Sequence, residues 1–208
     1  MRQRSLALSL YRAASWAMFA PFGGLDALRH HTLDALALGR SARVLELGCG
    51  PGDVTAALLA AGAQVHAVDS SSAMLGEAAR RAPGATFEQA DLRRYTPTGE
   101  YAAVLLAFVL HEVPMREIPG LVGRIAAALA PAGRVAVLDH AVPAGAAGWS
   151  WRVLLNAVEG RGVASWLALD LPEVLRRSGL APTHQRELAG GRVRLTLAQR
   201  LPDAVSGR

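Results

Sequence analysis

The 208-residue sequence predicts one α/β domain built on a doubly wound, mainly parallel sheet. A strand, a glycine-rich turn and a helix start follow one another over residues 44–55. Strand-like and helical segments then alternate up to residue 139. Residues 101–110 are nearly all apolar, which is typical of a central parallel strand covered on both faces. Hydrophobic residues make up 51% of the chain, enough for a packed core.

The glycine-rich turn is the most informative stretch. A buried strand is predicted over 44–47, and a helix is predicted to begin after Asp53, which stands at a favoured N-cap position. Between them, Gly48, Gly50 and Gly52 remove the side chains, so that a ligand can approach the backbone closely. A strand, tight turn and helix start in this order form a pocket at the carboxyl end of a parallel sheet.

Glu46 suggests the charge of the ligand. The glycine spacing is G-x-G-x-G, one residue shorter than the G-x-G-x-x-G of dinucleotide-binding sites. A carboxylate two places before the first glycine would repel a pyrophosphate but suits an amino group or a sulfonium. The simpler alternative is a plain strand–turn–helix connection without a ligand.

The stretch Glu46-Leu47-Gly48-Cys49-Gly50-Pro51-Gly52 resembles the first motif of class I S-adenosylmethionine-dependent methyltransferases, acid-x-Gly-x-Gly-x-Gly. More narrowly, the chain resembles the small-molecule group of methyltransferase types 11 and 25. The resemblance implies a Rossmann-like, seven-stranded sheet with a C-terminal β-hairpin, S-adenosylmethionine as cofactor and S-adenosylhomocysteine as product. It also implies that Glu46, Gly48, Cys49, Gly50 and Gly52 hold the methionine part.

The next strand, predicted over 64–68, ends in Asp69. This acid lies 21 positions after Gly48, near the roughly 20 expected for a ribose-binding carboxylate. The resemblance places an acid at this strand end, and Ser70 beside it is a further candidate cofactor contact. The alternative role for Asp69, capping the helix predicted over 71–82, is already covered by neighbouring serines.

A third strand, predicted over 86–90, leads to Asp91 and Leu92. In the resembling family, an acid here accepts a hydrogen bond from the adenine amine, and the next backbone N–H meets a ring nitrogen. Ala107, near the end of the fourth strand, completes the candidate cofactor-binding residues.

His111 is the candidate catalytic residue. It follows the strand predicted over 101–110, at the end of the sheet where open α/β folds place their ligands. Histidine titrates near neutral pH and can take a proton from a hydroxyl during methyl transfer. Glu112 either orients the ring or points away. The alternative is a histidine that bonds the backbone or shapes the cofactor pocket.

The second half continues the pattern with a helix over 117–130 and a strand over 135–139. Residues 140–168 depart from it and carry three tryptophans, which indicate either a substrate cap or core and dimer contacts. A helix over 171–178 with Asp170 as its cap and a hairpin over 183–201 close the chain.

These segments predict a single methyltransferase domain in four parts. Residues 1–40 form an apolar helical lid, 41–140 the cofactor-binding core, 141–168 the cap, and 169–201 the last helix and hairpin. Residues 1–22 are rich in Leu, Trp and Phe, so peripheral membrane contact is the alternative to a lid.

Composition narrows the function. The net charge is +5 from scattered arginines without the dense aromatic-lined stripe of nucleic-acid binders, so a solvated surface is expected. Cys49 is the single cysteine, which excludes an intrachain disulfide, and no Cys/His cluster has zinc-ligand spacing, so no metal is expected. Without an apolar run of about 20 residues or a signal peptide, the predicted location is cytoplasmic, or peripheral to a membrane.

The sequence thus predicts an enzyme that transfers a methyl group from S-adenosylmethionine to a small, apolar or amphipathic acceptor. A nicotinamide-dependent dehydrogenase is disfavoured by Glu46 and by the absence of lysine. A nucleic-acid amino-methyltransferase is disfavoured because His111-Glu112-Val113-Pro114 stands where that family has Asn/Asp-Pro-Pro-aromatic. A non-catalytic S-adenosylmethionine-binding or interaction module stays open as the alternative.

Overall fold

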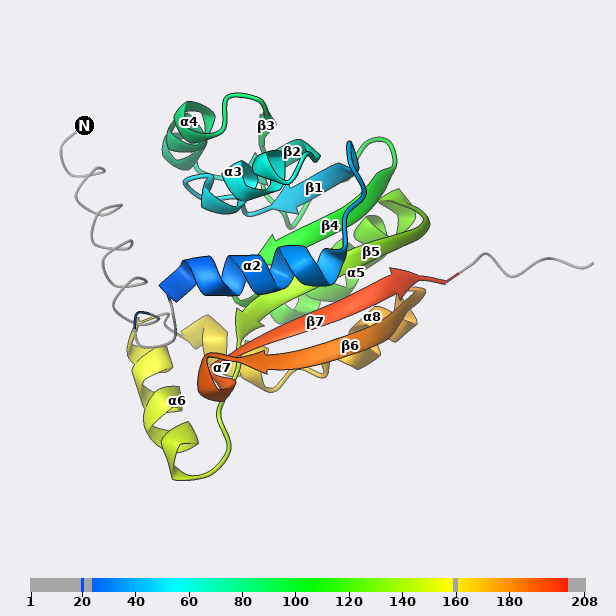
Figure 1. The fold of residues 1–208 in the computed structure, drawn as a ribbon. Helices are drawn as coiled ribbons and strands as arrows, with labels where there is room; N and C mark the ends of the chain where they lie inside the picture. Colours follow the sequence, from blue (N-terminus) through cyan, green and yellow to red (C-terminus); the bar gives the residue numbers. More distant parts are fainter. Residues whose placement is uncertain (1–19, 21–23, 159–160, 202–208) are drawn as a thin grey trace, which may run out of the picture.

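The computed structural model describes residue 20 and residues 24–158 and 161–201, which form a seven-stranded sheet with helices on both faces (Figure 1). The strand order is β3-β2-β1-β4-β5-β7-β6. β7 runs antiparallel to both of its neighbours, β5 and β6, and the other pairs are parallel. The strands are β1 (Arg43–Leu47), β2 (Gln64–Asp69), β3 (Thr86–Gln89), β4 (Tyr101–Ala107), β5 (Leu129–His140), β6 (Leu180–Leu188) and β7 (Val193–Arg200). The predicted doubly wound fold with its C-terminal hairpin is confirmed.

The helices divide between the two faces and one end of the sheet. One face carries α2 and α3, the other carries α5 and α8, and α6 lies beyond the ends of the parallel strands (Figure 1). The α-helices are α2 (Gly24–Leu36), α3 (Asp53–Ala60), α4 (Ser72–Arg81), α5 (Ile118–Ala128), α6 (Ala146–Val158), α7 (Arg161–Leu167) and α8 (Leu171–Arg177). The short 3-10 helices are η2 (Leu110–Glu112), η3 (Met115–Glu117) and η4 (Ala189–Gly191).

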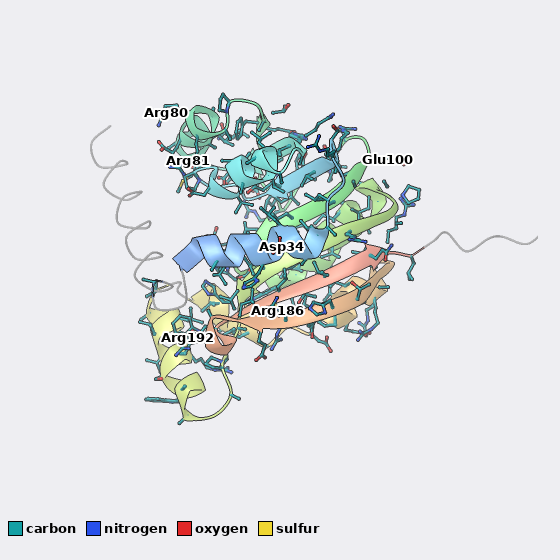
Figure 2. The ribbon with its side chains drawn as sticks, viewed as in Figure 1. Asp34, Arg80, Arg81, Glu100, Arg186 and Arg192 are labelled. Atoms are coloured by element: carbon teal, nitrogen blue, oxygen red, sulfur yellow. The ribbon has the colours of Figure 1, made fainter. Side chains whose placement is uncertain are left out.

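Charged side chains are spread over the surface. Figure 2 labels Arg80 and Arg81 on α4 at one end of the molecule, and Arg186 and Arg192 beside β6 and β7 at the other. Arg80 pairs with Glu77 one turn earlier, an exposed contact that stabilises the helix by a few tenths of a kcal/mol at most. The scattered arginines of the sequence therefore stay scattered in space.

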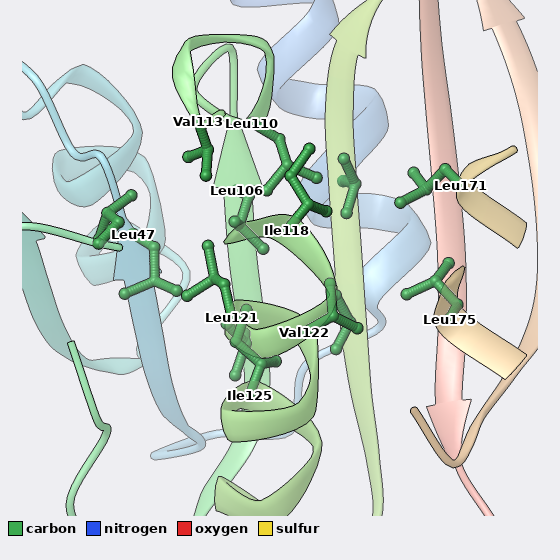
Figure 3. Close-up of a cluster of buried hydrophobic side chains, with 14 of the residues drawn as sticks. Leu47, Leu106, Leu110, Val113, Ile118, Leu121, Val122, Ile125, Leu171 and Leu175 are labelled. Carbon is green, nitrogen blue, oxygen red and sulfur yellow. The ribbon is translucent and has the colours of Figure 1, made fainter. Parts of the chain in front are cut away.

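The core consists of two clusters, one on each face of the sheet, because successive residues of a strand point to opposite faces. On β4, Val104 and Leu106 join the cluster under α5 and α8, whereas Ala103 and Leu105 join the one under α2 and α3. Figure 3 shows the first cluster, in which leucines of β1 and β4 meet residues of α5 and α8. This two-sided burial explains why the central strands read as continuous apolar runs.

Two predicted element boundaries are wrong. Asp53 is not the N-cap of α3: Gly52 holds that position in the left-handed region (φ 81°), and Asp53 is the first helical residue, paired with Arg81 at 2.6 Å. The fourth strand ends at Ala107 rather than at residue 110, because Phe108 adopts φ 53° and turns the chain into η2. His111 therefore lies on a 3-10 turn beyond the strand.

Two other regions also differ from expectation. β5 begins at Leu129, which pairs with Tyr101, and a register shift between Tyr101 and Ala103 accommodates the earlier start. Residues 141–168 contain two helices, α6 and α7, that the sequence pattern did not indicate.

The N-terminal predictions fall largely outside the described residues. The predicted lid and the alternative membrane contact both depend on the apolar segment 1–22. Residues 1–19 and 21–22 of this segment lie outside the described part of the structure. Within the described part, α2 packs against β5 and β7, with Leu28 and Leu36 almost fully buried. None of the described helices is long and apolar enough to cross a bilayer.

Candidate functional site

The glycine loop, residues 48–52, connects β1 to α3, and its three glycines have different roles. A Cβ on Gly48 would lie 2.4 Å from the Val109 side chain, and one on Gly52 would lie 2.7 Å from the Ala78 backbone. These two glycines therefore let the loop pack tightly against η2 and α4. A Cβ on Gly50 would meet nothing within 4 Å, so the middle of the loop borders open space where a ligand can approach.

Asp69 ends β2 beside this open space. Its carboxylate accepts hydrogen bonds from the backbone N–H groups of Gly50 and Ser71, each at 2.8 Å. An ionised carboxylate has about four acceptor positions, so two stay available after these bonds. Asp69 thus fixes the glycine loop and can still receive two further donors, as a ribose diol would provide.

Glu46 makes the base of the loop negative. It is only 2% exposed, and its Oε2 accepts a hydrogen bond from the Thr55 hydroxyl at 2.6 Å. Burial, Glu46 and Asp69, in that order of effect, raise the pKa of the Cys49 thiol far above its ordinary value. The loop therefore lies in a field that favours a cationic ligand over an anionic one.

The raised pKa of Cys49 has a measurable consequence. Only the thiolate reacts with alkylating agents, and a raised pKa leaves the thiol protonated throughout the neutral range. At pH 8, we expect iodoacetamide to modify the folded protein at least about 100-fold more slowly than the urea-unfolded chain. Because the chain has one cysteine, mass spectrometry reads this site alone. Labelling of the folded protein at the unfolded rate would contradict the burial and the negative field.

The remaining predicted cofactor contacts follow β2, β3 and β4. Leu92 is buried in the core, Ala107 ends β4, and the carbonyl of Ser70 accepts a hydrogen bond from the Gln89 side chain at 3.0 Å. They share the end of the sheet that carries the glycine loop, since all three strands run parallel to β1 or its neighbours.

Asp91 has a partner that the sequence did not suggest. Its carboxylate accepts hydrogen bonds from the Arg93 guanidinium, including one from Nε at 2.9 Å, and from the Arg93 backbone N–H at 3.0 Å. The Arg93 side chain is the main reason that the pKa of Asp91 falls to about 2. The pair is at the surface, so an incoming adenine amine can compete with Arg93 at low cost.

His111 is buried on η2 and is held by Asp139 of β5. Nδ1 of His111 lies 2.7 Å from Oδ1 of Asp139, and both side chains are less than 5% exposed. An ionised carboxylate can only accept, so Nδ1 carries the proton of this bond, and in the neutral imidazole Nε2 on the opposite side of the ring then has the lone pair. This His111–Asp139 pair, called the dyad below, has the arrangement of a general base and its orienting carboxylate.

Asp139 is saturated with hydrogen bonds. Oδ1 also accepts from the backbone N–H of His140 at 2.7 Å, and Oδ2 accepts from those of Leu110 and His111 at 3.0 and 3.2 Å. Together with the His111 ring, these four donors fill the acceptor positions of the carboxylate.

A metal at this place is the competing interpretation. One ligand atom from each of His111, Asp139 and His140 lies within 4.8 Å of the others, and the imidazole rings meet edge to face. Because four N–H groups already occupy the carboxylate of Asp139, a cation would have to displace at least one of them. The geometry favours the dyad.

The helices of residues 146–167 cover the dyad. α7 packs against η2, and a Cβ on Gly162 would lie 3.2 Å from the His111 carbonyl oxygen. Trp151 and Trp166 are buried, and their indole N–H groups donate to the carbonyls of Ala141 and His140. Trp149 is instead 75% exposed. The interpretation of the tryptophans as core residues is therefore right for two of the three.

The sequence reasoning missed Asp139 and His140, and it left open whether Glu112 orients the His111 ring or points away. Within the described structure, the carboxylate bonded to the His111 ring belongs to Asp139, not to Glu112. One signal was present: Asp139 ends the strand predicted over 135–139, and the carboxyl ends of parallel strands share one edge of a sheet.

Comparison with known proteins finds similarity to methyltransferases. Residues 44–133 match the family model described as a methyltransferase domain. A trans-aconitate 2-methyltransferase of Methylobacterium nodulans is 41% identical over 102 residues, which cover 48% of this chain and 39% of that protein. An uncharacterised methyltransferase of Synechocystis is 27% identical over 85% of this chain and 84% of its own length. The chain thus spans about two fifths of the first of these relatives.

Solved structures agree on the fold. A TehB-like methyltransferase from Corynebacterium glutamicum superposes with a TM-score of 0.68 at 19% identity, covering 95% of this chain and all of the other. The N-methyltransferase NodS of Bradyrhizobium japonicum, in complex with S-adenosylhomocysteine, gives 0.67 at 16% identity, covering 85% of this chain and 87% of the other. The family match over residues 44–133 and the shared fold agree with the predicted resemblance to class I S-adenosylmethionine-dependent methyltransferases.

Proposed function

We propose that this protein transfers a methyl group from S-adenosylmethionine to a small-molecule acceptor. The observation that carries the proposal is the glycine loop: its centre at Gly50 is open, its backbone is bonded to Asp69, and the carboxylates of Glu46 and Asp69 both act on it. S-adenosylmethionine supplies an electrophilic methyl group on a sulfonium sulfur. A negative, tightly built loop fits a ligand with two positive charges.

The residues divide the binding task. Glu46 and the backbone of the glycine loop hold the methionine part, and Asp69 with Ser70 holds the ribose. Asp91 and Leu92, with Ala107 nearby, hold the adenine once the cofactor displaces Arg93 from Asp91. Each assignment places a hydrogen-bonding group of the protein against a complementary group of the cofactor.

The dyad supplies the base. Asp139 holds the proton of His111 on Nδ1, so Nε2 can accept the proton that a hydroxyl or amino acceptor loses as it attacks. Asp139 then stabilises the imidazolium that forms. Alignment of the acceptor with the methyl group supplies the rest of the rate.

The dyad also favours an enzyme over a non-catalytic binding module. Burying an aspartate beside a histidine costs desolvation energy, and cofactor binding alone has no use for the pair. Release of S-adenosylhomocysteine in the presence of an acceptor separates the two functions.

The acceptor is proposed to be apolar or amphipathic. Trp149, Val153 and Leu154 expose apolar surface on α6, near the end of the sheet that carries the site. Trans-aconitate, which the relatives' names give as their acceptor, belongs in any acceptor screen. The lid over 1–40, the cap over 141–168 and a cytoplasmic or membrane-peripheral location are further parts of this proposal.

Calorimetry with S-adenosylhomocysteine tests the cofactor assignment. We expect the wild-type protein to bind, and Asp69→Ala to weaken binding by about 1–3 kcal/mol through the lost ribose bonds. Asp34→Ala, which removes an exposed acid of α2 labelled in Figure 2, is the matched control and should leave the affinity unchanged. Wild-type protein that does not bind at millimolar S-adenosylhomocysteine would refute the proposal.

A further inference from the structure

A second feature lies beside the dyad: a cavity of about 210 Å³ between the β5–β7–β6 edge of the sheet and residues from 141–152 and 166–172. We call it the polar cavity. Its lining combines apolar residues of β5 and α8 with polar residues from β5, α6, α7, β6 and β7. The residues that matter here are His140, Arg152, Trp166, Gln185, Arg194 and Thr196.

The polar side chains reach the cavity because of strand alternation. Gln185 of β6 pairs in register with Thr196 of β7, and Glu187 pairs with Arg194, so these four share one face of the hairpin. Leu195 and Leu197 point to the opposite face and join the core under α2.

The charge of the cavity is positive. Among the described residues that line it, two are arginines and none is acidic. Arg194 has a 3.4 Å ion pair with Glu187, but both side chains are about half exposed, which makes the pair weak and easily exchanged. Thr196 is 2% exposed and holds its hydroxyl 3.3 Å from the Gln185 amide. Two guanidinium groups with a neutral hydroxyl and amide are donors suited to a carboxylate.

One residue, His140, both lines the cavity and contacts the dyad. His140 lines the cavity, and its ring centroid is 4.8 Å from that of His111. The Trp166 indole, also in the lining, donates to the His140 carbonyl at 2.9 Å and fixes this wall. The cavity and the dyad are therefore neighbours at this end of β5.

We propose that the polar cavity binds a carboxylate group of the methyl acceptor, so that the acceptor is an organic acid whose nucleophilic atom faces His111. This inference rests on the proposed function and adds the chemical class of its substrate. It refines the amphipathic acceptor: apolar atoms pack near α6 and the acidic end binds between Arg152 and Arg194.

Calorimetry of the protein saturated with S-adenosylhomocysteine tests the inference at fixed ionic strength. The probes are citrate and succinate, with uncharged succinamide and inorganic phosphate for comparison. We expect at least one carboxylate to bind, and Arg194→Gln and Arg152→Gln each to weaken it about 10-fold or more through lost charge-assisted bonds. S-adenosylhomocysteine should bind all variants equally.

Arg186→Gln is the matched control. Arg186 is one residue from Gln185 on β6, and alternation places it on the opposite face of the hairpin, so the same loss of charge should change carboxylate affinity less than about twofold. Equal weakening by Arg186→Gln, equal binding of succinamide, or a preference for phosphate would each overturn the carboxylate site. The carboxylate site would also be overturned if the protein bound S-adenosylhomocysteine but neither citrate nor succinate. That result would leave the proposed function standing. Failure to bind S-adenosylhomocysteine would instead refute the proposed function.

Discussion

Replacement of His111 by alanine is expected to lower turnover by roughly 10²–10⁴-fold while the affinity for S-adenosylhomocysteine stays near its wild-type value. The reason is that Nε2, held in its accepting form by Asp139 on the other side of the ring, is the proposed proton acceptor. Steady-state kinetics and calorimetry on the same preparation separate the two quantities.

The pH profile gives a second readout of the same variant. A histidine base works only when neutral, so wild-type turnover should fall as the pH is lowered through its titration, and His111→Ala should lose this dependence. His184→Ala is the matched control, because His184 is exposed on β6 and should keep both turnover and profile. A His111→Ala protein with near-normal turnover but weakened cofactor binding would make His111 a pocket residue, and alignment alone would then carry the chemistry.

Replacement of Asp139 by alanine is expected to reduce the free energy of unfolding by about 3–5 kcal/mol. The carboxylate accepts three backbone N–H bonds and one from the His111 ring, and its removal leaves these donors buried without an acceptor. This loss is a large part of the roughly 5–15 kcal/mol that stabilises a typical domain. Urea unfolding followed by circular dichroism measures it.

Two further variants calibrate that result. Asp139→Asn keeps one acceptor oxygen and should lose less stability than alanine, so it stays measurable if the alanine variant does not fold. Asp170→Ala removes an exposed carboxylate that caps α8 through one bond to the Glu173 N–H, which should cost only about 1 kcal/mol. If Asp139→Ala cost no more than Asp170→Ala, the hydrogen-bond network around Asp139 would not have the strength that its geometry indicates.

The sequence predicted those parts of the site that depend on local pattern. Glu46 and Asp69 each stand at or near the end of an apolar strand, and parallel strands end at the same edge of a sheet, so their proximity to the glycine loop follows from spacing alone. The closing hairpin was equally predictable, because Gly190 and Gly191 interrupt two strand-like segments and both adopt positive φ.

The pairing of His111 with Asp139 could not be predicted from local sequence pattern. His111 and Asp139 are 28 residues apart and meet only because the chain leaves β4 early at Phe108 and turns back over the end of β5. Glu112 is next to His111 in sequence, but the 3-10 turn directs the ring toward β5 instead. The polar cavity has the same origin, since tertiary packing brings its walls together from β5, α6, α7, α8 and the hairpin.

The most direct test of the central claim is a crystal structure of the protein with S-adenosylhomocysteine. Our account predicts that the amino acid part lies on the glycine loop near Glu46 and that the ribose hydroxyls donate to Asp69. It also predicts that the sulfur faces the end of the sheet that holds His111. A ligand bound elsewhere, or one whose ribose does not contact Asp69 while its sulfur points away from the dyad, would contradict the account.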